Sequence, residues 1–204
     1  MINAILTGIT AYLSTGIDYI LILMTVLTFY QTTKERLKVY LGDVLGTICL
    51  VSISLMFSIS ARLIPEKWVL GLLGIIPIMI GAYILFKLNS EDEQEQVVKR
   101  LSKNNLILSV TIITITTCGA DNIGIYVPIF AQVNHWGELV VILMTFFAML
   151  NLFFVLAICF VKIPVIETLL QKYGDIFTAI VYIGIGIFIM VESDTITKLI
   201  QFIS

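Results

Sequence analysis

Long blocks of apolar residues, with few polar interruptions, dominate the pattern along this chain. Six blocks stand out, at about residues 3–30, 39–61, 69–88, 105–131, 138–161 and 176–200. Each is close to the ~20 residues that cross a ~30 Å hydrocarbon layer as an α-helix. The alternating pattern of a barrel strand is absent, and a helix satisfies its own backbone hydrogen bonds in lipid. The pattern therefore predicts an all-α integral membrane protein with six transmembrane helices.

Composition supports this prediction and excludes several other classes. Hydrophobic residues make up 59% of the 204 residues and charged residues 13%, against about 25% charged in a soluble domain. A net charge of −2 gives no basic surface for nucleic acid. The first block has no preceding Lys or Arg and is longer than a signal-peptide core, so we expect a retained first helix.

The basic residues predict an orientation in the membrane. Nine of the 12 Lys and Arg residues lie in three loops, at 31–38, 87–104 and 162–175. Since cytoplasmic loops carry an excess of Lys and Arg, these loops are expected in the cytoplasm and both termini outside. The hydrophilic segment 90–100 could be a regulatory or metal-collecting loop. A solvated linker between two halves is the favoured interpretation.

The two halves resemble each other around an acidic residue. TGID ends at Asp18 in the first block and CGAD ends at Asp121 in the fourth, 103 residues later. Because three helices are an odd number, a second copy must enter the membrane inverted, as in many transporters with a substrate site near the midplane. We expect two inverted three-helix repeats, at 1–88 and 105–204, joined by a cytoplasmic linker at 89–104.

Asp18 and Asp121 carry the strongest chemical signal. Each lies about 15 residues, or roughly 22 Å, into its predicted helix, and no predicted helix core holds a Lys or Arg to pair with it. A central carboxylate costs roughly 2.5–3.5 kcal/mol on insertion scales, so such groups usually bind a cation or proton. The structural alternative is a protonated Asp bonded to a neighbouring hydroxyl.

Helical spacing adds two further ligands beside Asp121. Thr114, Cys118, Asp121 and Asn122 follow one helix face. Carboxylate and amide oxygens alone suit Ca²⁺, Mg²⁺ or Mn²⁺, whereas a thiolate from Cys118 shifts the preference toward Zn²⁺ or Cd²⁺. A lone cysteine in a membrane helix is more often a packing residue. That interpretation is preferred for the other two cysteines, Cys49 and Cys159.

Asp43 is a further candidate, in the segment GDVLG at 42–46. It is either a cytoplasmic-side ligand or proton carrier, or an acidic group favoured by the macrodipole at a helix N-terminus. Gly42 and Gly46 form GxxxG, a motif of close helix packing. The predicted metal-site residues are thus Asp18, Asp43, Cys118, Asp121 and Asn122.

The sequence gives no sign of an enzyme. No GxxxxGK[ST] phosphate loop and no nucleophile–base pair occur. Any transport is therefore expected to be secondary, driven by an ion or proton gradient, with no resident cofactor.

Three segments carry a resemblance to a known family. TTCGADNIGIYVPIF at 116–130, IPEKWVLGLLGIIPIMIG at 64–81 and TGIDYILIL at 15–23 resemble the bacterial cadmium-resistance transporters, which are grouped with lysine-exporter-like membrane proteins. The resemblance runs from the first block to the last. It implies residence in the bacterial cell membrane and export of Cd²⁺, with Zn²⁺ as a second candidate.

Other functions fit less well. Two midplane carboxylates could also bind an amine, so an exporter of a small organic solute, such as a basic amino acid, is the main alternative. A thiol–disulfide electron carrier would need two cysteines able to pair, whereas the three cysteines lie on different predicted helices. The expected partners are a divalent metal cation and the lipid bilayer. A homo-oligomer is compatible with the sequence, but nothing in it supports one.

The predicted orientation can be tested by labelling. A cysteine introduced by Ser90→Cys should be protected from an impermeant thiol reagent in intact cells, because the positive-inside rule places this linker in the cytoplasm. A cysteine introduced by Asn134→Cys should be labelled as the matched external control. The reverse pattern would invert the topology.

Overall fold

Every element in the described part of the chain is a helix. The computed structural model describes residues 2–61, 67–86, 101 and 105–203. Within these ranges the elements are α1 (Ile2–Phe29), α2 (Thr33–Ala61), α3 (Lys67–Gly71), the 3₁₀ helix η1 (Leu72–Gly74), α4 (Ile75–Phe86), α6 (Leu106–Gln132), α7 (Trp136–Phe160), α8 (Pro164–Glu192) and α9 (Thr195–Ile203). The predicted all-α class is therefore confirmed, while the 90–100 segment lies outside the described residues.

Length and composition make this a multi-pass membrane protein. In the described residues, five stretches are long and apolar enough to cross a membrane, and α1 becomes a sixth if its two bent parts form one span. Large apolar side chains cover the outer surface of these helices, where lipid would solvate them. On α2 they are Leu37, Leu41, Leu45, Ile48, Met56, Phe57 and Ile59.

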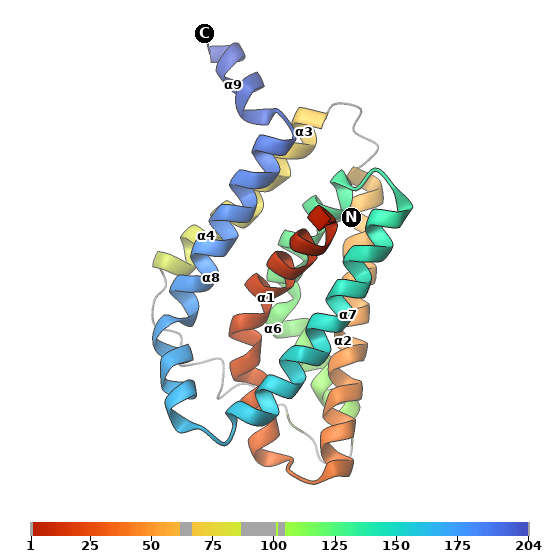
Figure 1. Cartoon of the computed structure of the whole chain (residues 1–204), viewed down its shortest axis with the longest axis vertical. Coiled ribbons are helices and arrows are strands. Elements are labelled where there is room, and N and C mark those ends of the chain that lie inside the picture. Colours follow the sequence, from red (N-terminus) through yellow and green to blue (C-terminus); the bar gives the residue numbers. More distant parts are fainter. Residues whose placement is uncertain (1, 62–66, 87–100, 102–104, 204) are drawn as a thin grey trace.

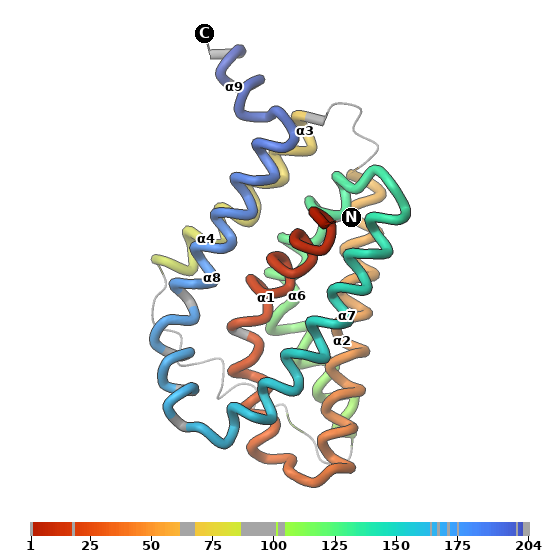
Figure 2. Tube along the Cα trace, in the orientation of Figure 1, coloured from red at the N-terminus to blue at the C-terminus, as the bar shows by residue number. Residues whose placement is uncertain are grey.

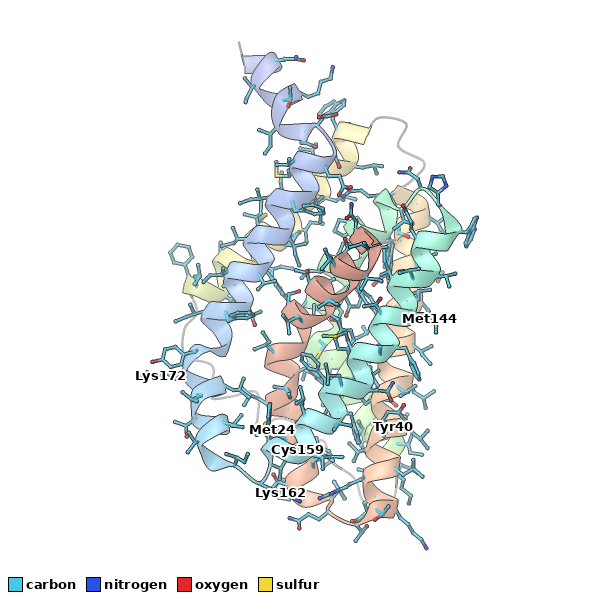
Figure 3. The ribbon with its side chains drawn as sticks, in the orientation of Figure 1. Met24, Tyr40, Met144, Cys159, Lys162 and Lys172 are labelled. Carbon is cyan, nitrogen blue, oxygen red and sulfur yellow. The ribbon has the colours of Figure 1, made fainter. Side chains whose placement is uncertain are left out.

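The helices form an elongated bundle with both chain ends at one end (Figure 1). The α1–α2 and α7–α8 connections lie at the opposite end. Lys162, in the α7–α8 connection, marks that basic end (Figure 3). This arrangement is what six spans require, and the side of the membrane that each end faces stays a prediction.

The contact between α2 and α6 is built on small residues. A Cβ atom on Gly42 would lie 2.7 Å from the Ile107 carbonyl oxygen, and one on Gly46 would lie 2.6 Å from Thr114 Cβ. The Thr111 hydroxyl donates across the interface to the Gly42 carbonyl at 3.0 Å. Small residues let backbones approach closely, and interhelical hydrogen bonds then add to the contact. The GxxxG motif therefore does what its pattern predicted.

Two further helix pairs complete the bundle. Tyr12 of α1 packs against Phe146 and Phe153 of α7, with ring centroids 5.8 and 5.6 Å apart. The pair of α4 and α8 also approaches closely, since a Cβ on Gly81 would lie 2.8 Å from the Ala179 carbonyl oxygen. The 3₁₀ turn before α4 precedes Pro77, which has no N–H to offer Leu73 in a regular helix.

The first helix changes direction near its middle. Its two parts, Ile2–Ile17 and Tyr19–Phe29, are inclined by 57°, and the tube in Figure 2 shows the change of direction in α1. Just before it, the Ser14 and Thr15 hydroxyls bond back to carbonyls of the preceding turn at 2.7 and 3.3 Å. Hydroxyl back-bonding and a glycine at position 16 are both established causes of helix bending.

The sixth span differs from its prediction at 176–200. α8 begins at Pro164, because proline is well suited to the first helical turn and its fixed φ favours a start there. The predicted loop at 162–175 was therefore mostly wrong. The helix ends at Glu192, and Asp194 takes a left-handed conformation with φ 56° before α9 starts. The polar residues that interrupt the apolar block thus separate two helices.

The close α2–α6 contact predicts that a side chain larger than glycine at position 46 destabilises the protein. Gly46→Ala should destabilise the protein by roughly 1–3 kcal/mol, because an added methyl group overpacks the interface against Thr114. Gly184→Ala is the matched control, since a Cβ there meets no atom within 4 Å. Thermal unfolding of the purified proteins in detergent measures both, and equal melting temperatures would contradict the proposed packing.

Candidate cation site between three helices

A buried carboxylate lies where α1, α2 and α6 meet. Asp43 of α2 is 1% exposed, and its Oδ1 lies 2.8 Å from the hydroxyl of Tyr19 on α1. The same hydroxyl lies 2.8 Å from Thr114 Oγ1 on α6. One tyrosine therefore connects three helices through two short hydrogen bonds.

The start of α2 bears on the two interpretations of Asp43. The sequence pattern placed the start of the second span at residue 39, but α2 begins at Thr33. Asp43 therefore lies about three turns inside the helix, whereas the macrodipole acts mainly within the first turn. This position does not favour the macrodipole interpretation, and the ligand or proton-carrier interpretation stays a prediction.

A small cavity lies beside this carboxylate. Its walls come from α1, α2 and α6, namely Tyr12, Thr15, Gly16, Tyr19, Thr47, Thr114, Cys118, Asn122 and Tyr126. About 10 Å³ of it is open to the centre of a water-sized sphere, which is roughly the space of one water molecule or one small ion. Oxygen atoms and one thiol line it.

Asn122 supplies an unused ligand atom in this wall. Its side chain is 7% exposed, and its Oδ1 is buried without a hydrogen-bond partner. Leaving a buried acceptor unsatisfied costs about 1–3 kcal/mol. A cation or a water molecule in the cavity would remove that cost, so the cavity wall is chemically incomplete when empty.

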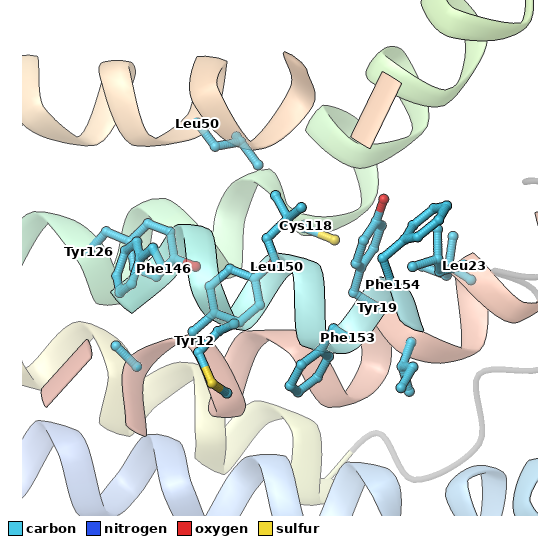
Figure 4. Close-up of a cluster of buried hydrophobic side chains, with 14 of the residues drawn as sticks. Tyr12, Tyr19, Leu23, Leu50, Cys118, Tyr126, Phe146, Leu150, Phe153 and Phe154 are labelled. Carbon is cyan, nitrogen blue, oxygen red and sulfur yellow. The ribbon is translucent and has the colours of Figure 1, made fainter. Parts of the chain in front are cut away.

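Cys118 lies in the same wall, with Thr114 and Asn122 of its predicted helix face but without Asp121. It is buried, and Figure 4 shows it beside Tyr19, with Tyr12 and Tyr126 nearby. Cys49 and Cys159 are exposed on the outside of the bundle. Of the three cysteines, Cys118 is therefore the one whose sulfur can meet an ion in this cavity.

The structure says less about the two strongest candidates from the sequence. Asp18 belongs to α1 between its two inclined parts, but its side chain lies outside the described residues. Asp121 is half-buried and is not among the residues that line the small cavity. Among the described residues, no three His, Cys, Asp or Glu side chains lie together in a group that could hold a metal ion. A cavity shared by Asp18 and Asp121 stays a prediction.

Sequence reasoning missed the tyrosines. Tyr12 and Tyr19 line the cavity from α1, and Tyr126 lines it from α6, where its hydroxyl lies 3.1 Å from Thr15 Oγ1. Within an apolar block, the large ring of tyrosine makes it look like another hydrophobic residue, although its hydroxyl is polar. The available signal was spacing, because Thr114, Cys118, Asn122 and Tyr126 recur at every fourth residue. Following that pattern one step further would have found Tyr126.

A larger cavity opens at the end of the bundle where the chain termini lie. It has a volume of about 150 Å³ and is lined by the N-terminal turns of α1, the C-terminal turns of α6 and α8, and the start of α7. Its polar residues include Asn3, Gln132, Glu138 and Glu192. α6 contributes to both cavities, so they lie along one helix.

Comparison with known proteins gives one clear result. The family described as cadmium resistance transporter matches residues 12–202, which is nearly the whole chain. Comparisons with curated proteins and with solved structures each gave no match. The match begins inside the first predicted span, ends beyond the last, and includes Asp43 and every residue that lines the small cavity, and this chain therefore belongs to the cadmium resistance transporter family.

Proposed function

We propose that this protein exports Cd²⁺ from the cytoplasm by secondary transport, with the ion passing through the core between α1, α2 and α6. The proposal rests on one observation above all: a buried carboxylate beside an ion-sized cavity whose wall holds an unsatisfied amide oxygen. The family is one of transporters rather than enzymes. Direction and driving force are parts of the proposal.

Asp43, Cys118 and Asn122 are the proposed ligands in the described core, and Asp18 and Asp121 complete the proposed pathway. A carboxylate, an amide oxygen and a thiolate together favour a borderline or soft divalent ion, such as Cd²⁺ or Zn²⁺, over Mg²⁺. The tyrosine and threonine hydroxyls of the cavity wall would replace part of the hydration shell. Zn²⁺ is therefore proposed as a second substrate.

The cavity size argues against the organic-solute alternative. A space of about 10 Å³ for a water-sized centre fits one ion or one water molecule. An amino acid is several times larger than a water molecule and would require the three helices to separate. The site in this conformation thus supports an inorganic cation, and competition between Cd²⁺ and lysine for binding would separate the two functions.

Helix positions support an inverted repeat. A shift of 103 residues moves α1 (Ile2–Phe29) to 105–132, next to the observed α6, and moves the start of α2 from Thr33 to Trp136, where α7 begins. α1 runs away from the end where the termini lie, and α6 runs toward it (Figure 1). We propose repeats at 1–88 and 105–204 joined by the 89–104 linker.

The same symmetry relates the pairs of helices that pack against each other. If α1 corresponds to α6 and α2 to α7, the contact of α2 with α6 and that of α1 with α7 are equivalent. α4 would correspond to α8, its own packing partner. In such folds, the substrate site lies where the repeats meet and helices are bent or broken, which is where the bend of α1 lies. The larger cavity is the proposed exit toward the outside.

The two sequence-predicted carboxylates give the first functional test. Asp18→Asn and Asp121→Asn should each lower Cd²⁺ uptake into everted membrane vesicles by at least about ten-fold, since losing a metal ligand or its orienting partner typically costs 10–100-fold. Asp194→Asn, an exposed site at the end of α8, is the matched control. Full transport by both core variants, at equal protein levels in the membrane, would remove these residues from the pathway.

Cys118 should set metal selectivity. Cys118→Ser keeps the approximate size but replaces soft sulfur with hard oxygen, so Cd²⁺ transport should fall more than any Mn²⁺ transport. Transport of both ions, normalised to protein in the membrane, gives the selectivity ratio. Cys49→Ser and Cys159→Ser, on the exposed surface, should leave it unchanged. An unaltered ratio in Cys118→Ser would make Cys118 a packing residue.

A further inference from the structure

The small and the larger cavity lie close together along the same two helices. On α6, Asn122 and Tyr126 line the small cavity, whereas Ile129 lines the larger one. On α1, Tyr12 lines the small cavity and Thr7 lines the larger one. At 1.5 Å per residue, the two cavities are separated by roughly 4.5 Å along α6 and roughly 7.5 Å along α1. About one to two helical turns of protein therefore divide them.

Four aromatic rings pack together at this level. Phe146 of α7 lies 5.8 Å from Tyr12 and 4.5 Å from Tyr126 between ring centroids, and Figure 4 shows Tyr126 and Phe146 side by side. Phe130 joins them, 6.0 Å from Tyr126 and 5.9 Å from Phe146. All four rings are buried, with exposed fractions of 6% or less. We call Tyr12, Tyr126, Phe130 and Phe146 the aromatic barrier.

The position of the aromatic barrier is the one that a barrier on the pathway would need. Ile142, one turn before Phe146 on α7, lines the larger cavity, and Tyr12 and Tyr126 line the small one. Among the described residues, the two cavities share no lining residue. An ion that crossed packed rings would lose its hydration without gaining ligands, which is strongly unfavourable. Apolar constrictions of this kind close channels to ions and water.

Tyr126 connects the aromatic barrier to the small cavity and to the bend of α1. Its ring belongs to the barrier, while its hydroxyl lies 3.1 Å from Thr15 Oγ1 in the wall of the small cavity. Thr15 precedes the point where the two parts of α1 are inclined by 57°. One hydrogen bond thus holds the ring of Tyr126 against the part of α1 that carries Tyr12.

The proposed repeats place this barrier opposite the buried carboxylate. The shift of 103 residues makes Phe146 of α7 equivalent to Asp43 of α2. The neighbouring positions behave alike, since Gly42 packs on α6 and a Cβ on Gly8 of α1 would lie 3.0 Å from Thr145 Cβ. Equivalent helix contacts therefore carry a carboxylate in one repeat and an apolar ring in the other.

We propose that the aromatic barrier is the gate between the small cavity and the larger cavity, and that Tyr126 is its moving part. This inference rests on the proposed function. The gate is closed in this structure, because the rings are packed and buried. It opens when Tyr126 releases Thr15 and turns away from Phe146, which joins the two cavities. It closes when the hydrogen bond to Thr15 forms again.

The thiol of Cys118 can report on this gate, because it lies in the wall of the small cavity. With Cys49→Ser and Cys159→Ser as background, Phe146→Ala should speed modification of Cys118 by an impermeant thiol reagent by at least about ten-fold, since removing a buried ring leaves a cavity. Phe154→Ala, about two turns along the same helix and lining neither cavity, is the matched control and should leave the rate unchanged.

The side from which the reagent arrives is part of the test. The gain should appear only from the side on which Asn134→Cys is labelled, because Asn134 follows the end of α6, and Gln132 there lines the larger cavity. Intact cells and everted vesicles present the two sides. An equal gain from both sides, an equal gain in Phe154→Ala, or no gain in Phe146→Ala would overturn the inference.

Tyr126→Phe tests the moving part with little change in shape. It keeps the ring but removes the hydrogen bond to Thr15, so Cys118 should be modified roughly two- to ten-fold faster, as expected for the loss of one net hydrogen bond. An unchanged rate would overturn the role of Tyr126. If Phe146→Ala does not fold, this variant decides the gate.

Adding Cd²⁺ separates the gate from the proposed function. Excess Cd²⁺ should slow the modification of Cys118 in Phe146→Ala, because a bound ion occupies the small cavity beside the thiol. If Cd²⁺ gives no protection, the proposed metal site fails, whereas a gain in labelling confined to one side still establishes the gate. Protection without that gain would support the metal site and overturn the gate.

Discussion

The close contact of α2 with α6 is the constraint on which the site depends. Gly42 and Gly46 bring the backbone of α2 against Ile107 and Thr114 of α6, and these glycines stand on either side of Asp43. A larger residue at either position would separate the helices and open the carboxylate to lipid. The residues that permit the contact and the residue that it buries thus belong to one turn of one helix.

The bend of α1 supplies the third wall. The polar residues that line the small cavity from α1 come from both sides of its bend. With its two parts inclined by 57°, α1 brings Tyr12 and Thr15 from one part and Tyr19 from the other to the same small cavity. The back-bonded hydroxyls of Ser14 and Thr15 lie just before the bend, and such hydroxyls often bend helices.

The polar groups in this core are energetically unfavourable while the cavity is empty. A buried carboxylate and an unsatisfied amide oxygen are each unfavourable in an apolar interior, and either a proton or a cation can compensate them. A cation in the small cavity would therefore offset part of this cost, in agreement with the proposed function.

The sequence by itself determined the membrane class, the helical state and most span positions, because hydropathy and backbone hydrogen bonding in lipid act on each segment locally. It also placed Cys118 and Asn122 on one helix face by spacing alone. It did not predict that α8 begins at Pro164, because a proline and several charged residues in this segment are typical of a loop. It likewise placed the start of the second span at residue 39, six residues after α2 begins, and so placed Asp43 too near the start of its helix.

Only the tertiary structure decided which polar groups meet. Tyr19 is 24 residues from Asp43 and 95 residues from Thr114 along the chain, so no local pattern joins them. Their contact depends on the close approach that two glycines allow and on the bend of α1. Periodicity fixes the face that a residue occupies on its own helix, whereas the packing of one helix on another decides what that face touches.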